Sequence, residues 1–219
     1  EDLAGNATHR DAGTGGFAVF AQCTVPPEED PAKTLGRDDV TSLALQVHSA
    51  DDASCLNLNH AVQPTILGVP SERLRALGAF TGEDGAALWA LLTEPRADNA
   101  VPALVGDADT AMWGLKKKTD PETGDVLDYV DEAGRPFKVK LVGKLPMRLS
   151  VFQGSLLIDQ AAFARRFPSE TGHRMFLFDA PHDTAPALAE DLNRRLAESG
   201  IEATTTVDRL REFYVVEQT

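Results

Sequence analysis

The hydrophobic pattern is clearest in the last third of the chain, where short apolar runs alternate with amphipathic segments. The apolar runs that predict strands are 154–159, 174–180 and 201–207. A helix is expected after the first run, over 160–167, because Asp159 is a favourable N-cap and Pro168 stops the helix. A second helix is expected to start at Asp183 or Thr184 and to end at Ser199, before Gly200.

These five segments predict a β-α-β-α-β unit whose helices cover one face of a sheet. The pattern continues past this unit with a helix that begins near Asp208. Nearer the N-terminus, residues 16–23 predict a buried strand and 40–48 a half-buried one. The stretch 83–95 predicts a helix with an apolar stripe at Ala87, Leu88, Leu91 and Leu92.

The middle of the chain is richer in strands than in helices. Residues 126–130 and 137–145 predict an antiparallel hairpin with a tight turn at 132–134. Side chains of the second strand are expected to alternate between two faces. The expected buried face carries Phe137, Val139, Leu141 and Leu145, and the expected solvent-exposed face carries Lys138, Lys140 and Lys144.

Together these elements predict an α+β fold with two subdomains. One subdomain is expected to be a split β-α-β layer built from both chain ends, 15–50 and 146–215, and to lie close to a membrane. The other is expected to be an inserted β-rich lobe, 51–145. Residues 1–14, which are polar and rich in glycine and alanine, are expected to form a flexible lead-in.

Composition narrows the class of partner. The chain has 219 residues, 42% hydrophobic and 25% charged, which is typical of a packed globular protein. Its net charge of −13 disfavours binding to nucleic acid and to anionic lipid surfaces. The sequence has no apolar run of transmembrane length and begins at Glu1 rather than at methionine. We therefore expect a piece of a longer protein.

Residues capable of catalysis are present, but they form no recognised motif. Ser155 lies in QGS, without the GxSxG sequence of a nucleophile elbow. The GTGG at 13–16 precedes a strand, whereas a dinucleotide site needs a glycine-rich turn that opens a helix. The five histidines are scattered without metal-ligand spacing: His9, His48, His60, His173 and His182.

Carboxylates and cysteines leave three alternatives open. Asp107 and Asp109 form a local acidic pair, for which a role in turns and solvation is favoured over a calcium or catalytic site. Cys55 is either a reactive thiol or, more in keeping with its surroundings, an inert buried one. Cys23 and Cys55 are expected to form a disulfide if the domain matures outside the cytoplasm. We predict no catalytic, cofactor-binding or metal-binding residues.

The order of four segments resembles the large extracytoplasmic domain of MacB/FtsX-like ABC-transporter permeases. They are DDASCLNLNHAVQPTILGVP (51–70), VPALVGDADTAMWGLKKKTDPETGDVLDYVDEAGRPFKVKLVGKL (101–145), SVFQGSLLIDQAAFARRFPSETGHRMFLF (150–178) and GIEATTTVDRLREFYVV (200–216). The resemblance extends from about residue 16 to the C-terminus. The chain departs from the family at KKKTDPETGDV, where a shorter approach to the Gly-Asp step is typical.

The resemblance implies a non-enzymatic domain without catalytic residues or cofactors. It implies a location on the extracytoplasmic face of the cytoplasmic membrane, periplasmic or at the cell exterior, with an anchor of transmembrane helices outside this chain. Implied partners are a cytoplasmic ABC ATPase, reached through those helices, a second permease copy and an extracytoplasmic protein. The function would be to couple ATP-driven movement of membrane helices to export, lipoprotein handling or envelope regulation.

Two other functions remain alternatives. The chain could be a freestanding secreted or periplasmic ligand-binding protein, or a hydrolase that uses Asp107, Asp109 or Cys55. A cleft with converging carboxylates would favour the hydrolase. If the permease assignment is correct, we expect the helix at the C-terminus, DRLREFYVVEQT, to continue into the bilayer in the parent protein.

Overall fold

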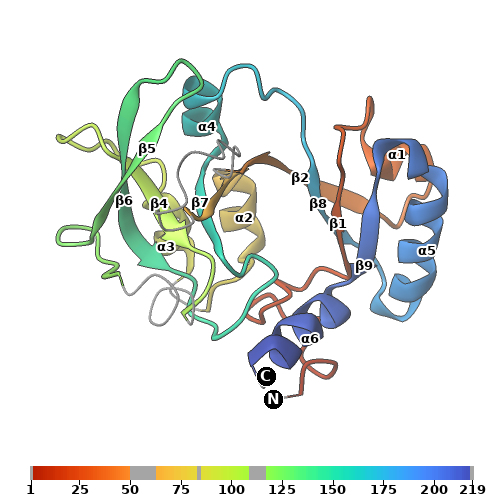
Figure 1. The fold of residues 1–219 in the computed structure, drawn as a ribbon. Coiled ribbons are helices and arrows are strands. Elements are labelled where there is room, and N and C mark those ends of the chain that lie inside the picture. Colours follow the sequence, from red (N-terminus) through yellow and green to blue (C-terminus); the bar gives the residue numbers. More distant parts are fainter. Residues whose placement is uncertain (1, 50–62, 83–84, 109–116, 218–219) are drawn as a thin grey trace.

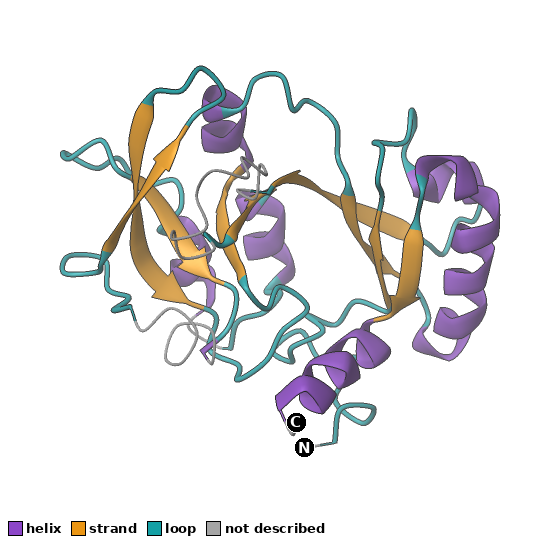
Figure 2. Ribbon diagram, in the orientation of Figure 1, coloured by secondary structure: helices purple, strands orange, loops and turns teal. Residues whose placement is uncertain are grey.

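The computed structural model describes residues 2–49, 63–82, 85–108 and 117–217. Nine strands form one open, mixed sheet in the order β5-β6-β4-β7-β3-β2-β8-β1-β9. Figure 2 shows helices packed on both faces of this sheet. The chain therefore has the α+β class that the sequence predicted.

The strands are β1 (Val19–Gln22), β2 (Thr41–His48), β3 (Thr65–Val69), β4 (Val101–Val105), β5 (Val126–Val130), β6 (Pro136–Lys144), β7 (Ser155–Asp159), β8 (Met175–Asp179) and β9 (Glu202–Thr205). The α-helices are α1 (Pro31–Leu35), α2 (Ser71–Leu77), α3 (Gly85–Ala90), α4 (Gln160–Arg166), α5 (Ala185–Arg195) and α6 (Thr206–Glu217). Two short 3-10 helices, η2 (His182–Thr184) and η3 (Ala197–Ser199), flank α5.

Strand β2 belongs to two groups of strands. Its residues up to Leu45 pair with β8, and its residues from Gln46 onward pair with β3 on the other edge. Strands β8, β1 and β9 continue one group with antiparallel pairing, and β3, β7, β4, β6 and β5 form the other with mixed pairing. We call β2, β8, β1 and β9 the four-strand group, and β2, β3, β7, β4, β6 and β5 the six-strand group. Strand β2 belongs to both groups and connects them, as Figure 1 shows.

The strand order bears on the predicted subdomains without deciding them. Strands β3 to β6, from the predicted lobe 51–145, all lie in the six-strand group. Strand β7, from the segment 146–215, lies between β4 and β3 in that same group. Hydrogen-bonded pairing continues across the whole sheet and marks no boundary between the two predicted subdomains. The two-subdomain division therefore stays a prediction.

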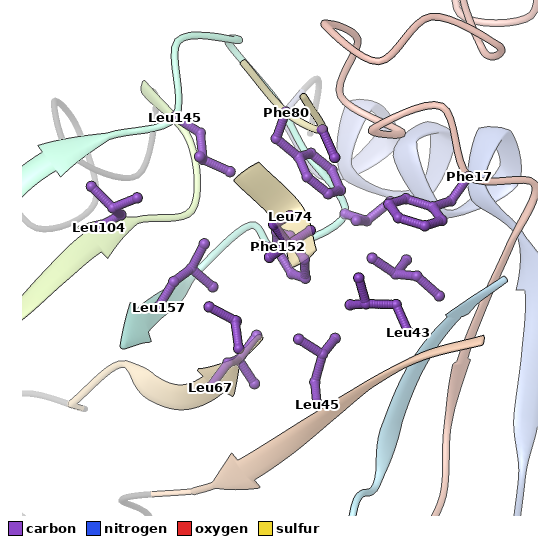
Figure 3. Close-up of a cluster of buried hydrophobic side chains, with 14 of the residues drawn as sticks. Phe17, Leu43, Leu45, Leu67, Leu74, Phe80, Leu104, Leu145, Phe152 and Leu157 are labelled. Carbon is purple, nitrogen blue, oxygen red and sulfur yellow. The ribbon is translucent and has the colours of Figure 1, made fainter. Parts of the chain in front are cut away.

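One large hydrophobic cluster lies on the face of the sheet that is enclosed between the two groups of strands (Figure 3). We call this face the inner face and this cluster the inner cluster. Leu43 and Leu45 of β2 enter this cluster, whereas Ala44 packs on the opposite face, as the two-residue period of a strand requires. Helix α5 covers the opposite face over the four-strand group, and α4 covers it over the six-strand group. Both helices therefore lie on one face of the sheet, as predicted.

The predicted β-α-β-α-β order is confirmed as β7-α4-β8-α5-β9. The Asp159 carboxylate accepts a hydrogen bond of 2.9 Å from the Ala161 N–H, so the predicted N-cap is also confirmed. The expected helix 183–199 is interrupted near Leu196, where α5 gives way to η3, and Gly200 ends η3 in the left-handed region with φ of 64°.

The predicted hairpin is confirmed, since β5 and β6 pair antiparallel from Val126↔Lys140 to Val130↔Pro136. The face assignment of β6 was wrong at two positions. The register against β4 shifts after Leu141, and Leu145 therefore joins the inner cluster while Leu141 stays on the opposite face. Lys140 is buried, and its ammonium donates to the Glu122 carbonyl at 2.8 Å, which offsets part of the cost of that burial.

The helix expected near Asp208 is α6, which begins at Thr206. The Thr206 hydroxyl donates to the Phe17 carbonyl at 2.6 Å, which fixes the start of the helix against the start of β1. Leu210 is buried in the inner cluster, and Phe213 and Tyr214 pack partly against it. Among the described residues, none of the helices is long and apolar enough to cross a membrane.

Candidate functional site

A polar pocket of about 270 Å³ opens where the two groups of strands separate at β2. The four-strand group and its helix contribute Cys23, Arg174 and Arg209 to the lining, and the six-strand group contributes Thr65 and Ser155, with Gln153 just before β7. We call this cavity, defined by these six residues, the seam pocket. A ligand in it would touch both halves of the sheet.

Arg209 is held in place by two aromatic rings. Its guanidinium carbon lies 4.5 Å from the centre of the Phe20 ring and 4.7 Å from that of Phe213, as in cation–π contacts. Among the described residues, it pairs with the carboxylate of Glu212, 3.8 Å away and 62% exposed, so the ion pair is weak. Burial lowers the pKa of Arg209, although an arginine side chain keeps its charge at neutral pH.

Arg174 is fixed beside the point where β2 changes its partner. Its backbone N–H donates to the Leu45 carbonyl at 3.2 Å, and its own carbonyl accepts from the Cys23 N–H at 2.7 Å. Its guanidinium donates to the Val47 carbonyl at 2.9 Å. One hydrogen bond uses one of the five N–H donors of an arginine, so the side chain retains donors for a further acceptor.

Two buried polar atoms of the seam pocket residues have no hydrogen-bond partner within the described part of the chain. They are Nε of Arg209, a donor, and Oε1 of Gln153, an acceptor. Leaving a buried polar group unpaired costs about 1–3 kcal/mol. Both atoms belong to residues that line one cavity, but both are buried in the protein. A ligand in the seam pocket would reach them only after the side chains turn toward it.

Cys23 supplies no nucleophile to this pocket at neutral pH. Its thiol is free and 5% exposed, and burial raises its pKa, so the protonated form predominates. Because the structure leaves Cys23 unpaired, it does not contain the disulfide considered from the sequence. Cys55, the expected second half of that disulfide and the candidate reactive thiol, lies outside the described residues.

Of the other residues considered for chemistry, the structure describes Asp107 and Ser155. Asp107 is fully buried, and Asp109 lies outside the described residues. Ser155, the first residue of β7, lines the seam pocket with its backbone carbonyl bonded to Gly106 N–H at 3.0 Å. The structure therefore offers no test of the alternative that pairs Asp107 with Asp109.

The described histidines occupy four separate places. His48 pairs with Glu170 at 2.7 Å and stacks on Phe167, while His182 contacts the Gly16 carbonyl at 2.9 Å. Burial lowers the pKa of His173, and His9 is exposed; His60 lies outside the described residues. Within the part of the chain that the structure describes, no three His, Cys, Asp or Glu side chains gather as metal ligands would.

Among the described residues, three cavities are larger than the seam pocket. The largest of them, about 670 Å³, lies between α4 and the segment 92–102, and it mixes Arg96, Arg165 and Arg166 with Glu94 and Asp159. Another, about 410 Å³, mixes Arg73 with Glu28, Glu29 and Asp30. The third, about 440 Å³, is mainly apolar and is lined by Leu88 and Leu91 near α3. The described lining of the seam pocket contains two arginines and no carboxylate, which singles it out in a chain of net charge −13.

Sequence reasoning missed Arg174, Arg209 and Gln153. Each is a polar residue at or near the end of a strand or helix, where such residues are common, so the sequence offered no signal that marks it as a ligand contact. No protein-family model and no curated protein matches this chain.

Proposed function

We propose that this chain is a non-enzymatic extracytoplasmic domain of an ABC-transporter permease, similar to the MacB/FtsX-like domains that its sequence resembles. It would be joined to transmembrane helices outside this chain and would couple their ATP-driven movement to export, lipoprotein handling or envelope regulation. Its partners would be a cytoplasmic ABC ATPase, a second permease copy and an extracytoplasmic protein.

The pairing of β1 with β9 carries this proposal. The first residue of β1, Val19, is the register partner of the last residue of β9, Thr205. The next residue, Thr206, bonds to the carbonyls of Phe17 and Ala18. The chain thus enters and leaves the sheet at one place, and Figure 1 shows both termini at the same end of the molecule. A domain inserted between two membrane helices needs this arrangement.

Helix α6 is the element that would connect this domain to the membrane. It leaves the sheet directly after β9, with Leu210 packed on the inner cluster and Val215, near its other end, 66% exposed. A helix that packs at its start and presents apolar residues towards its end suits a connection to a neighbouring membrane segment.

The sheet supports a mechanical role. All nine strands are connected by pairing, and apolar clusters are buried on both faces. Close-packed interiors are stiff and have low compressibility. A displacement applied at the end where β1 and β9 meet would therefore be carried into the sheet as a whole.

The seam pocket favours a second function, that of a freestanding secreted or periplasmic ligand-binding protein. Two arginines and several uncharged polar residues line a small cavity, as expected of a site for a polar ligand. A permease domain can also carry such a pocket, so the two functions are separated by attachment to a membrane rather than by the pocket.

Accessibility in intact cells tests the proposal. In the native host, the full parent protein would carry Cys55→Ser and a new cysteine at the exposed position Glu198, and cells would be treated with a membrane-impermeant maleimide. We expect labelling before lysis, co-sedimentation with washed membranes and co-purification of an ABC ATPase. The matched control lacks the Glu198 substitution and keeps the buried Cys23 of this chain, and only labelling in excess of that control counts as labelling at position 198.

Labelling only after lysis would refute an extracytoplasmic location. Labelling in intact cells combined with release of the protein into the medium or the periplasm, free of membranes, would favour the ligand-binding alternative.

A further inference from the structure

We propose that the seam pocket is a binding site for a compact oxyanion, a carboxylate or a phosphate group, held by Arg174 and Arg209. This inference stands independently of the permease proposal, because it concerns the chemistry of one cavity in the folded chain.

Charge is the first argument. The chain carries 34 acidic and 21 basic residues, yet the described lining of the seam pocket has two guanidinium groups and neither Asp nor Glu. A positive cavity within a negative protein attracts an anion locally, since low-dielectric walls strengthen the field inside a cleft. Among the described residues, the carboxylate of Glu212 competes for Arg209, but it lies 3.8 Å away and is mostly exposed to solvent.

The orientation of Arg209 is the second argument. Phe20 and Phe213 both lie against its guanidinium group, at 4.5 and 4.7 Å. Stacking on ring faces leaves the N–H donors, which lie in the guanidinium plane, to bond at its edge. Its Nε is buried without a hydrogen-bond partner in the described residues, so a ligand would bond first to the terminal N–H groups and would reach Nε only after the side chain shifts toward the cavity. Carboxylates and phosphates match the fork of donors on an arginine with two parallel hydrogen bonds.

Arg174 and Gln153 would supply the remaining hydrogen bonds to the bound oxyanion. Arg174 uses one donor on the Val47 carbonyl and keeps others. Gln153 also lines the pocket, and its Oε1, which is buried and lacks a partner in the described residues, becomes an acceptor for the ligand once the side chain turns toward the cavity. A protonated or hydroxyl-bearing oxyanion offers acceptors to the two arginines and a donor to Gln153. The hydroxyls of Thr65 and Ser155 complete a lining that suits oxygen atoms of a ligand.

Size limits the ligand. The volume of about 270 Å³ is below the ~300–1,000 Å³ of sites for drug-sized molecules. The pocket therefore fits an anionic group alone, whether it belongs to a free ion or to the end of a larger molecule that stays outside. Because the two groups of strands both line the pocket, an anion bound there would add contacts between them and raise the melting temperature.

The test uses three probes on the purified chain: inorganic phosphate, acetate and glycerol 3-phosphate. The first two represent free anions, and the third represents a lipid headgroup without its acyl chains. Each would be titrated at constant ionic strength, with the melting temperature and the ¹⁵N–¹H signal of the Arg209 Nε–H as readouts. We expect saturable changes in both readouts with at least one probe, and the strongest probe identifies the source of the anionic group.

Variants separate this site from general charge effects. Arg209→Gln should weaken binding by about tenfold or more, since loss of a charge-assisted hydrogen bond exceeds the ~1.4 kcal/mol that a factor of ten represents. Gln153→Leu should weaken it less. Arg165→Gln, at an exposed arginine of the largest cavity, is the matched control and should bind like the wild type.

If Arg209→Gln does not fold, the Arg209 Nε–H signal of the wild-type chain decides the question alone. The proposal is overturned if no probe moves that signal saturably, or if Arg165→Gln abolishes the effect while Arg209→Gln preserves it. Either outcome leaves the permease proposal untouched, because that proposal is tested in cells.

Discussion

The indole N–H of Trp89 donates a hydrogen bond of 2.8 Å to the backbone carbonyl of Ala79. Both residues are fully buried in the inner cluster, and they tie α3 to the turn that follows α2. The largest buried side chain of the described residues is thus anchored by its one polar atom, as buried tryptophans require.

Trp89→Phe should destabilise the chain by about 1–3 kcal/mol, because it leaves the Ala79 carbonyl unpaired and opens a small cavity. Urea unfolding followed by circular dichroism would measure the loss. Val130→Ala, at an exposed residue of β5, serves as control and should change the free energy of unfolding by less than about 0.5 kcal/mol. Equal effects of the two substitutions would contradict the anchoring role of Trp89.

Gly68 lies in β3, where an added Cβ would come within 2.6 Å of the Gln46 side chain and 2.8 Å of Phe163. Gly68→Ala should therefore destabilise the chain by about 1–3 kcal/mol through overpacking between β3 and α4. The comparison is Gly82→Ala, where a Cβ meets nothing within 4 Å. Chemical denaturation of both variants side by side would show the difference, and a stable Gly68→Ala would count against the close packing of α4.

The Asp159 carboxylate accepts hydrogen bonds from two helices, α4 and α2. One carboxylate oxygen caps α4 through the Ala161 N–H, and the other accepts a hydrogen bond from the Ser71 hydroxyl at the start of α2. Asp159→Ala should cost about 1–2 kcal/mol, the upper range for a lost N-cap, and Ser71→Ala should cost less. A double-mutant cycle would measure the coupling between the two positions, with the exposed Asp183→Ala as control.

Additivity of Asp159→Ala and Ser71→Ala would show that the two side chains do not support each other. A coupling of about 0.5 kcal/mol or more is the expected result for residues in contact.

The thiol of Cys23 makes stability depend on pH above neutrality. Its pKa is raised in the folded state by burial, so the unfolded chain loses the thiol proton first, near pH 8.5. The unfolded state then binds fewer protons than the folded state, and the free energy of unfolding falls as pH rises above that value. The contribution is fully present below pH ~8.5 and is lost as pH approaches the folded-state pKa.

Unfolding curves measured from pH 7 to pH 10 would test this dependence. Cys23→Ala should flatten the decline relative to wild type, even if it lowers stability at every pH. A decline of the same slope in Cys23→Ala would assign the effect to other groups.

The elements that the sequence predicted well are those whose signals are local. The β-α-β-α-β run rests on apolar periodicity, on the Asp159 cap and on the stop at Gly200, all within a few residues of the element concerned. A similar local signal, the N-cap Asp30 followed by Pro31, starts α1. Helix propensity and capping act over one or two turns, so the sequence displays them directly.

The features that could not be predicted depend on partners distant in sequence. The placement of β7 between β3 and β4, and the register shift that carries Leu145 to the inner face, follow from pairing between strands tens of residues apart. The same holds for the seam pocket, because Arg174 and Arg209 meet Gln153 only when both groups of strands are assembled. None of these three residues lies in a local sequence pattern that indicates ligand binding.

Strand β1 has a consequence for how the chain folds as it is synthesised. Its two neighbours, β8 and β9, both come from the last quarter of the chain, with Gln22 paired to Met175 and to Glu202. About 150 residues must therefore leave the ribosome before the apolar residues of β1 find either partner, and at ~5–20 residues per second this takes on the order of ten seconds or more. Until then, Val19 and Phe20 belong to an exposed segment of the nascent chain that is prone to aggregation.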